Sequence, residues 1–265
     1  MGLLGLFKRH TFSHGVHPPE NKALTADKPI KRLPFAPRMI VPLSQHIGAP
    51  AVPLVSPGQE VVRGEPIARA EGFMSVPIHA PATGVIEGIE LMPTARGPKG
   101  EAIVLRVYAG DGQQVLYGGE RDLETATPEE IIGAIRDTGM VGLGGAGFPT
   151  HVKLTLPEGA KVDTLVVNGC ECEPYLTTDH RIMLEHPREL IAGIRLVMRA
   201  VGTARAVIGI EDNKPDAAEA VRQALPEGAP IDVRLVETKY PQGSEKMLIK
   251  SLLDREVPSG GLPSQ

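Results

Sequence analysis

Short apolar runs separated by turn residues dominate the first part of the chain. Between residues 39 and 110 such runs recur every few positions, with Pro-Gly, Arg-Gly and Ala-Thr-Gly turns between them. Closely spaced short strands of this kind are typical of a small β-sandwich or β-barrel. The pattern therefore predicts an all-β domain over residues 39–110.

The pattern changes to alternating strands and helices after residue 162. Apolar strands are predicted at 164–167, 206–210 and 231–236, and amphipathic helices at 188–201, 215–225 and 244–253. This alternation indicates βαβ units around a parallel sheet. An earlier helix is predicted after Thr127, which begins a capping box with Pro128 at the first helical position, and Gly139 can end that helix. The fold class is therefore α/β, with a Rossmann-like three-layer domain over residues 127–257.

The remaining segments connect or flank these domains. Residues 1–38 form an extended, proline-punctuated arm, residues 111–126 a polar linker and residues 258–265 a Gly/Pro-rich end. The arm contains His14 and His17, a spacing that a metal site can use. Pro18 and Pro19 force extended backbone beside them and no thiolate accompanies them. We therefore expect a structural or docking arm.

The charge and cysteine content limit the kinds of ligand and environment that suit this chain. The formal net charge is −4, from 28 basic and 32 acidic residues, and no basic stripe suggests nucleic acid. No apolar run approaches the ~20 residues that span a bilayer. Cys170 and Cys172 lie two residues apart, which excludes a disulfide framework and favours a reducing cytoplasm. Two thiols are too few for a zinc or iron–sulfur site, so we predict that they line a pocket, with redox activity as the alternative.

Polar residues follow each predicted strand of the α/β domain. Ligands bind beyond the carboxyl ends of the strands in open α/β sheets. The segments at those ends are residues 168–173, 211–214 and 240–245, which we call the strand-end rim. Glu171 and Glu173 alternate along the chain and should face the same side, with a solvated pair as the alternative. Asp179, His180 and Arg181 are expected to precede a helix, in capping or packing roles.

Residues 139–150, the glycine loop, hold five glycines within nine residues. Glycines let backbone N–H groups approach an anion, and a helix beginning near Phe148 would add its positive end. Lys153 and His151 could contribute contacts to a phosphate. A flexible hinge is the alternative, and the loop lacks the Gly-Lys-Ser/Thr of a Walker loop.

The glycine loop followed by Asn168-Gly-Cys-Glu-Cys-Glu-Pro174 resembles the flavin-binding subunit of respiratory NADH dehydrogenase. In that family the glycines hold the phosphate of flavin mononucleotide (FMN), and the Asn and acidic segment contact the flavin and the nicotinamide nucleotide. Ser244 departs from that family's Gly-Glu-Glu helix start. Hydride transfer would be cofactor-mediated, with no catalytic side chain. The predicted cofactor-binding residues are Gly142, Gly144, Gly145, Ala146, Gly147, Phe148, Lys153, Asn168, Cys170, Glu171, Glu173, Glu211, Tyr240, Gly243 and Glu245.

A second resemblance is more specific. The chain resembles the C subunit of the Rnf ion-translocating oxidoreductase complex in residues 12–20, 42–50, 168–174 and 240–246. This resemblance implies FMN and NAD(H) as cofactors, and the other Rnf subunits and ferredoxin or an equivalent carrier as partners. It also implies a peripheral position at the cytoplasmic face of the bacterial inner membrane. The β domain resembles the barrel-sandwich hybrid fold of lipoyl and biotinyl carriers, but its hairpin at residues 71–75 lacks the modified lysine.

Two alternatives stay open: the A subunit of a sodium-pumping NADH:quinone reductase, and a non-catalytic scaffold that docks through the arm and β domain. The Rnf family continues with a β-grasp-like segment and two iron–sulfur motifs. With only two cysteines, this chain is expected to hold no metal site, so the 4Fe–4S clusters belong to the full-length family protein. Residues 258–265 then read as the truncated start of the next segment. We expect the glycine loop and the strand-end rim to converge on one pocket.

Overall fold

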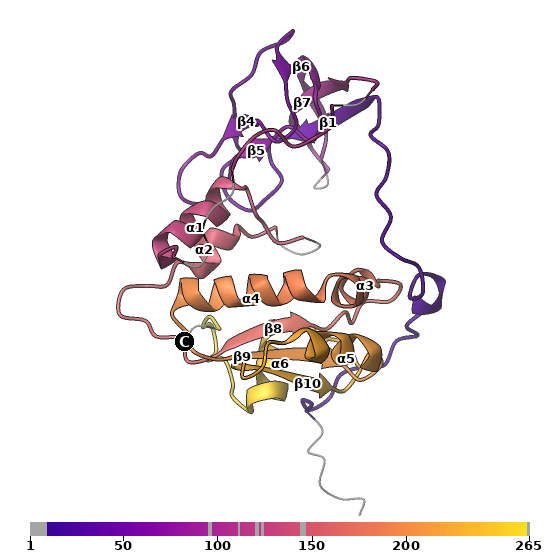
Figure 1. The fold of residues 1–265 in the computed structure, drawn as a ribbon, viewed down its shortest axis with the longest axis vertical. Coiled ribbons are helices and arrows are strands. Elements are labelled where there is room, and N and C mark those ends of the chain that lie inside the picture. Colours follow the sequence, from indigo (N-terminus) through magenta and orange to yellow (C-terminus); the bar gives the residue numbers. More distant parts are fainter. Residues whose placement is uncertain are drawn as a thin grey trace, which may run out of the picture. The chain divides into compact units, whose positions relative to one another are not determined.

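The computed structural model describes residues 10–94, 97–110, 112–119, 122, 125–143 and 147–263. They form two compact units (Figure 1). The α/β unit joins the arm up to Lys31 to residues 156–265, and the β unit covers Arg32–Thr155. Residues 127–155, which the sequence pattern grouped with the α/β domain, thus belong to the β unit.

Two antiparallel sheets build the β unit, which confirms the predicted all-β sandwich. The first has the order β1-β7-β6-β3 and the second β2-β4-β5. Aliphatic side chains such as Ile67, Ile86, Ile103 and Leu105 form one core. The strands are β1 (Arg38–Pro42), β2 (Val52–Pro53), β3 (Glu60–Val61), β4 (Pro66–Arg69), β5 (Ile78–His79), β6 (Gly84–Pro93) and β7 (Lys99–Val107).

Helix α1 (Pro128–Asp137) confirms the predicted capping box. The Thr127 hydroxyl accepts from the Glu130 amide at 3.3 Å, and the Glu130 carboxylate accepts from the Thr127 amide at 2.7 Å. These bonds satisfy two amides that the helix leaves free, and Ile131 is buried on the inner face. Helix α2 (Thr150–Leu154) follows Pro149 and has only five residues.

The α/β unit is built on three parallel strands in the order β10-β9-β8. These are β8 (Leu165–Gly169), β9 (Ala206–Glu211) and β10 (Ile231–Val236); the helices are α3 (Thr178–Glu185), α4 (Pro187–Val201), α5 (Pro215–Ala224) and α6 (Glu245–Leu253). Every residue of β9 is buried. Ile208 and Ile210 pack with α3, α4 and α5, whereas Val207 packs with α6. Figure 1 shows these helices beside the sheet. Side chains alternate across a strand, so the helices cover both faces of the sheet, as the three-layer prediction requires.

One helix of this unit was not predicted. Asp179, His180 and Arg181 lie inside α3 rather than before a helix. The helix has eight residues, a weakly amphipathic sequence and no side-chain cap at Thr177, so its local signal is poor. Tertiary contacts hold it instead: Met183 is buried in the core and the His180 imidazole lies 3.0 Å from the Asp216 carboxylate.

The arm is a structural part of the α/β unit. Isolated bridges join His10 to Val236 and Val16 to Tyr240, and a short 3-10 helix, η1 (Lys22–Leu24), interrupts the extended path. Across the described residues, no helix combines the length and apolar character needed to cross a membrane.

Candidate functional site

The strand-end rim comes together at the carboxyl edge of the parallel sheet, as predicted from strand order. The Asn168 side-chain amide donates to the Gly243 carbonyl at 2.8 Å and accepts from the Cys170 amide at 3.1 Å. The Asp212 carboxylate accepts from the Thr238 hydroxyl at 2.6 Å. The ends of all three strands are therefore tied together by polar contacts within one unit.

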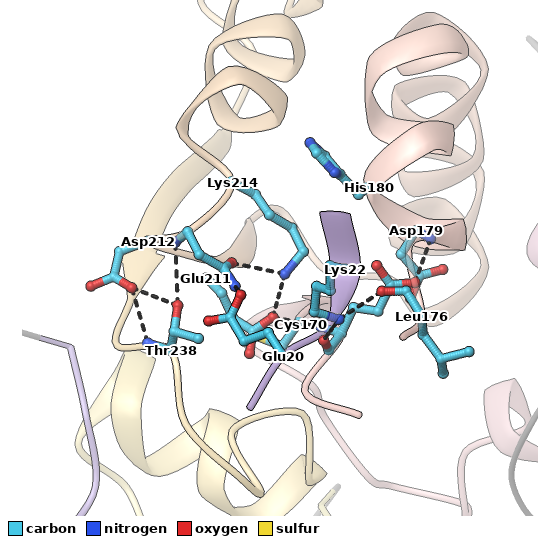
Figure 2. A network of polar contacts seen from close by, with 12 residues as sticks. Glu20, Lys22, Cys170, Leu176, Asp179, His180, Glu211, Asp212, Lys214 and Thr238 are labelled. Atoms are coloured by element: carbon cyan, nitrogen blue, oxygen red, sulfur yellow. Dashed lines mark hydrogen bonds and ion pairs between the residues drawn. The ribbon is translucent and has the colours of Figure 1, made fainter. Parts of the chain in front are cut away.

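A buried ion pair lies at the centre of the rim. The Glu211 and Lys214 side chains are 1% and 2% exposed, and Lys214 Nζ lies 2.6 Å from Glu211 Oε2. The same oxygen accepts from the Glu171 amide at 2.9 Å. A charge buried to this extent requires a close partner, and each of these two residues supplies it to the other. Figure 2 shows the pair, which lies between the end of β9 and the start of α5.

Glu171 and Glu173 do not share an environment, contrary to the sequence prediction. Strand β8 ends at Gly169, so the alternation of an extended strand does not continue to these residues. Glu171 is 4% exposed and its Oε1 accepts from the Asp179 amide at 2.9 Å, whereas Glu173 is exposed. Glu171 is thus held inside the rim and Glu173 faces solvent.

Both cysteines are free thiols. Cys170 is buried beneath the rim, and burial followed by the nearby Glu211 carboxylate raises the pKa of its thiol far above the usual range. Burial also raises the pKa of the half-buried Cys172 thiol. Since the thiolate is the reactive form, these environments favour the packing role over the redox alternative.

The arm and the rim together line a small, partly open cavity. Its volume is about 40 Å³, and its lining includes Glu20 and Lys22 from the arm and Glu171 and Glu211 from the rim. That space suits a water molecule rather than a nucleotide. One carboxylate oxygen each of Glu171 and Glu211 is buried without a hydrogen-bond partner within the described part of the chain.

The glycine loop belongs to the β unit. Its ends are held together by a bridge between Val141 and Pro149, and the Gly142 amide donates to the Phe148 carbonyl at 2.9 Å. Gly147 has φ +63°, and a Cβ there would lie 3.2 Å from the Gln45 carbonyl oxygen. Gly144, Gly145 and Ala146 lie outside the described residues. The convergence of this loop with the strand-end rim, which belongs to the other unit, stays a prediction.

Two side chains after the glycine loop were predicted as possible phosphate contacts. His151 is buried, and its Nε2 lies 2.9 Å from the Phe73 carbonyl oxygen. Its ring also packs edge-on against the Phe73 ring, with 5.7 Å between centroids. His151 therefore anchors the hairpin at residues 71–75 rather than facing a ligand. Lys153 lies in α2.

The third rim segment leads from β10 into α6 and contains Tyr240, Gly243 and Glu245. Tyr240 is 42% exposed, and its backbone pairs with Val16 of the arm through bonds of 2.8 and 2.9 Å. Glu245 is exposed and begins α6. A Cβ on Gly243 would lie 3.2 Å from the Cys170 carbonyl oxygen and 3.3 Å from Cys172 Sγ, so the close approach of the segments favours glycine there.

Three residues important to this site were not singled out from the sequence, although Lys214 and Gln242 lie within the predicted rim segments. Gln242 is fully buried and donates to the Ser251 hydroxyl at 2.9 Å. Lys214 follows Glu211 at a spacing of three, which was a usable signal for the ion pair. Lys22 contacts residues about 150 positions away, and local patterns carry no signal for such a contact.

Comparisons with known proteins match both units. A family model described as the RnfC barrel sandwich hybrid domain matches residues 10–109, and the Nuo51 FMN-binding domain matches residues 135–265. Among solved structures, an NAD+-reducing NiFe-hydrogenase in the H2-reduced state covers 50% of this chain and 25% of its own, at 28% identity and a TM-score of 0.42.

Two curated relatives match nearly the whole chain. It is 45% identical over 254 residues to the C subunit of the proton-translocating ferredoxin:NAD(+) oxidoreductase complex of Clostridium ljungdahlii, covering 96% of this chain and 55% of that protein. It is 41% identical over 263 residues to the Na(+)-translocating counterpart of Acetobacterium woodii, covering 97% and 58%. The chain thus spans little more than half of each relative. It belongs to the RnfC family, the C subunits of the Rnf ferredoxin:NAD(+) oxidoreductase complexes.

Proposed function

We propose that this chain binds FMN and NAD(H) and forms the electron-input part of a ferredoxin:NAD+ oxidoreductase complex. The observation that carries this proposal is the strand-end rim at the carboxyl edge of a parallel sheet, where Asn168 bonds to Gly243 and the Glu171 amide bonds to Glu211. Nucleotides bind at this edge in open α/β sheets. The FMN-binding family model over residues 135–265 supports the same site.

Each unit offers residues that suit such a nucleotide. The glycine loop would hold the phosphate through backbone amides, and Phe148, which is 36% exposed, would offer a face for stacking. At the rim, the exposed Asn168 side-chain amide would meet polar groups of the nucleotide. The exposed Glu173 would contact the nicotinamide nucleotide. When bound, FMN supplies the exchange between two-electron hydride donors and one-electron carriers.

The partners follow from the relatives, which are subunits of ferredoxin:NAD(+) oxidoreductase complexes. We propose that the other subunits of such a complex, and ferredoxin or an equivalent carrier, exchange electrons with the site through iron–sulfur clusters outside this chain. The chain would associate peripherally with the cytoplasmic face of the membrane.

An FMN titration of this chain tests the proposal. Quenching of flavin fluorescence and a rise in melting temperature with FMN and NADH are expected. Phe148→Ala and Glu173→Gln should each weaken nucleotide binding on the order of tenfold, because each removes one direct contact. Phe35→Ala and Glu227→Gln, which change an equally exposed ring and an exposed carboxylate elsewhere, should leave binding unchanged. A folded, colourless protein that binds neither FMN nor NADH would favour the scaffold alternative.

A further inference from the structure

The arm is fastened to the α/β unit on both sides of Lys22. Before it, the backbones of Val16 and Tyr240 exchange hydrogen bonds of 2.9 and 2.8 Å. After it, the Arg181 guanidinium donates to the Ala26 carbonyl at 3.0 Å. Hydrogen bonds on both sides of Lys22 therefore hold the segment that places it at the rim.

The Lys22 ammonium is enclosed by backbone carbonyls of the segment that leads from β8 to α3. Its Nζ donates to the carbonyl oxygens of Glu171 at 2.7 Å, Glu173 at 3.0 Å and Leu176 at 2.6 Å (Figure 2). An ammonium has three N–H donors, so these three bonds use all of them. Residues 171–176 are thereby wrapped around a single cation.

The groups around this cation act on its charge in opposite directions. Burial, followed by the Lys214 ammonium, lowers the pKa of Lys22, while the Glu171 and Glu211 carboxylates oppose that shift. A neutral side chain at position 22 would remove all three of these charge-assisted hydrogen bonds. The bond to Glu171 is partly buried and those to Glu173 and Leu176 are exposed, so without the ammonium the segment would be free to change its path.

We propose that Lys22 is a positioning residue of the nucleotide site: its ammonium sets the backbone path of residues 171–176 and thereby places Glu171 and Glu173. The inference rests on the proposed function for its effect on FMN, whereas its effect on the backbone can be measured independently. Under this proposal the arm, through Lys22, forms part of the nucleotide site.

Chemical rescue of Lys22→Ala tests this role in the whole chain. The substitution removes three methylenes and the amine, which propylammonium matches in its heavy atoms. Hydrogen exchange at residues 171–177 should accelerate and FMN affinity should fall about tenfold. Propylammonium should restore both, whereas tetramethylammonium, which has no N–H donor, should restore neither. If that variant fails to fold, Lys22→Met, which keeps the apolar stem and leaves no room for propylammonium, replaces it in the exchange and affinity measurements.

Lys28→Ala is the matched control, since it removes the same charge from an exposed position on the same arm. It should alter neither exchange nor FMN affinity. Unchanged exchange at residues 171–177 in Lys22→Ala would overturn the proposal whether or not the protein binds FMN. Faster exchange with unchanged FMN affinity would overturn the link to the nucleotide site. Failure of the unmodified chain to bind FMN would instead sink the proposed function, and the exchange data would still decide the backbone role.

Discussion

The charged residues of the rim affect the stability of the fold because they are buried, not because there are many of them. Glu211 and Lys214 are almost fully buried, and the Glu211 carboxylate also accepts a hydrogen bond from the Glu171 amide. A buried pair of this kind contributes little relative to an apolar pair, yet breaking it is costly because one charge stays buried alone. The single and double variants should therefore behave very differently.

We predict that Glu211→Gln lowers the free energy of unfolding by about 3–5 kcal/mol, because it strands the Lys214 ammonium. Lys214→Met should cost a similar amount by stranding the carboxylate. The double variant should recover much of the loss. Urea unfolding of all three proteins gives the coupling energy, and additive losses in the double variant would contradict this view of the pair.

The cysteines allow a test that depends on pH. Because the pKa of each thiol is raised, the thiolate becomes populated only at higher pH than in a free cysteine. Alkylation by iodoacetamide at pH 8 should therefore be slower than that of glutathione by at least about tenfold, and should keep rising with pH. Cys172, which is only half-buried, should react before Cys170. Rapid labelling of Cys170 in the folded protein at pH 7 would restore the redox alternative.

At the scale of elements, local pattern predicted most of the fold. The strand prediction 231–236 coincides with β10, and the helix prediction 215–225 ends one residue beyond α5. These elements carry an apolar period or a capping residue within their own sequence. Helix α3 lacks both signals, and its buried Met183 is recognisable only once the sheet it packs on is known.

Two glycines, Gly133 within α1 and Gly139 just after it, should respond in opposite ways to substitution by alanine. Gly139 has φ +74°, and a Cβ there would lie 2.5 Å from the Pro77 carbonyl oxygen, whereas a Cβ on Gly133 meets nothing within 4 Å. Gly139→Ala should destabilise the protein by more than about 1 kcal/mol. Gly133→Ala should stabilise it by about 0.5–1 kcal/mol, since alanine is the better helix former. Thermal unfolding of the two variants checks the opposite signs.

At the scale of the whole molecule, the candidate site combines segments that are distant in the sequence. The rim was predictable because strand order alone brings residues 168–173, 211–214 and 240–245 to one edge. The attachment of the arm was not, because hydrogen bonds such as that from Lys239 to Phe12 join residues 227 positions apart. Such contacts depend on the final packing of both segments and produce no periodic pattern in the sequence.

This attachment predicts that one aromatic ring near the start of the chain stabilises the α/β unit. Phe12 is 8% exposed, the Lys239 ammonium lies 4.1 Å from its ring centroid, and Lys239 Nζ donates to its carbonyl at 2.5 Å. Phe12→Ala should cost about 3 kcal/mol through the lost packing and cation–π contact, and should expose the arm to protease. Phe35→Ala, at a more exposed ring that contacts Arg63 within the β unit, is the control and should cost less than about 1 kcal/mol. Equal losses in the two variants, with an arm that stays resistant to trypsin, would show that the ring does not fasten the arm.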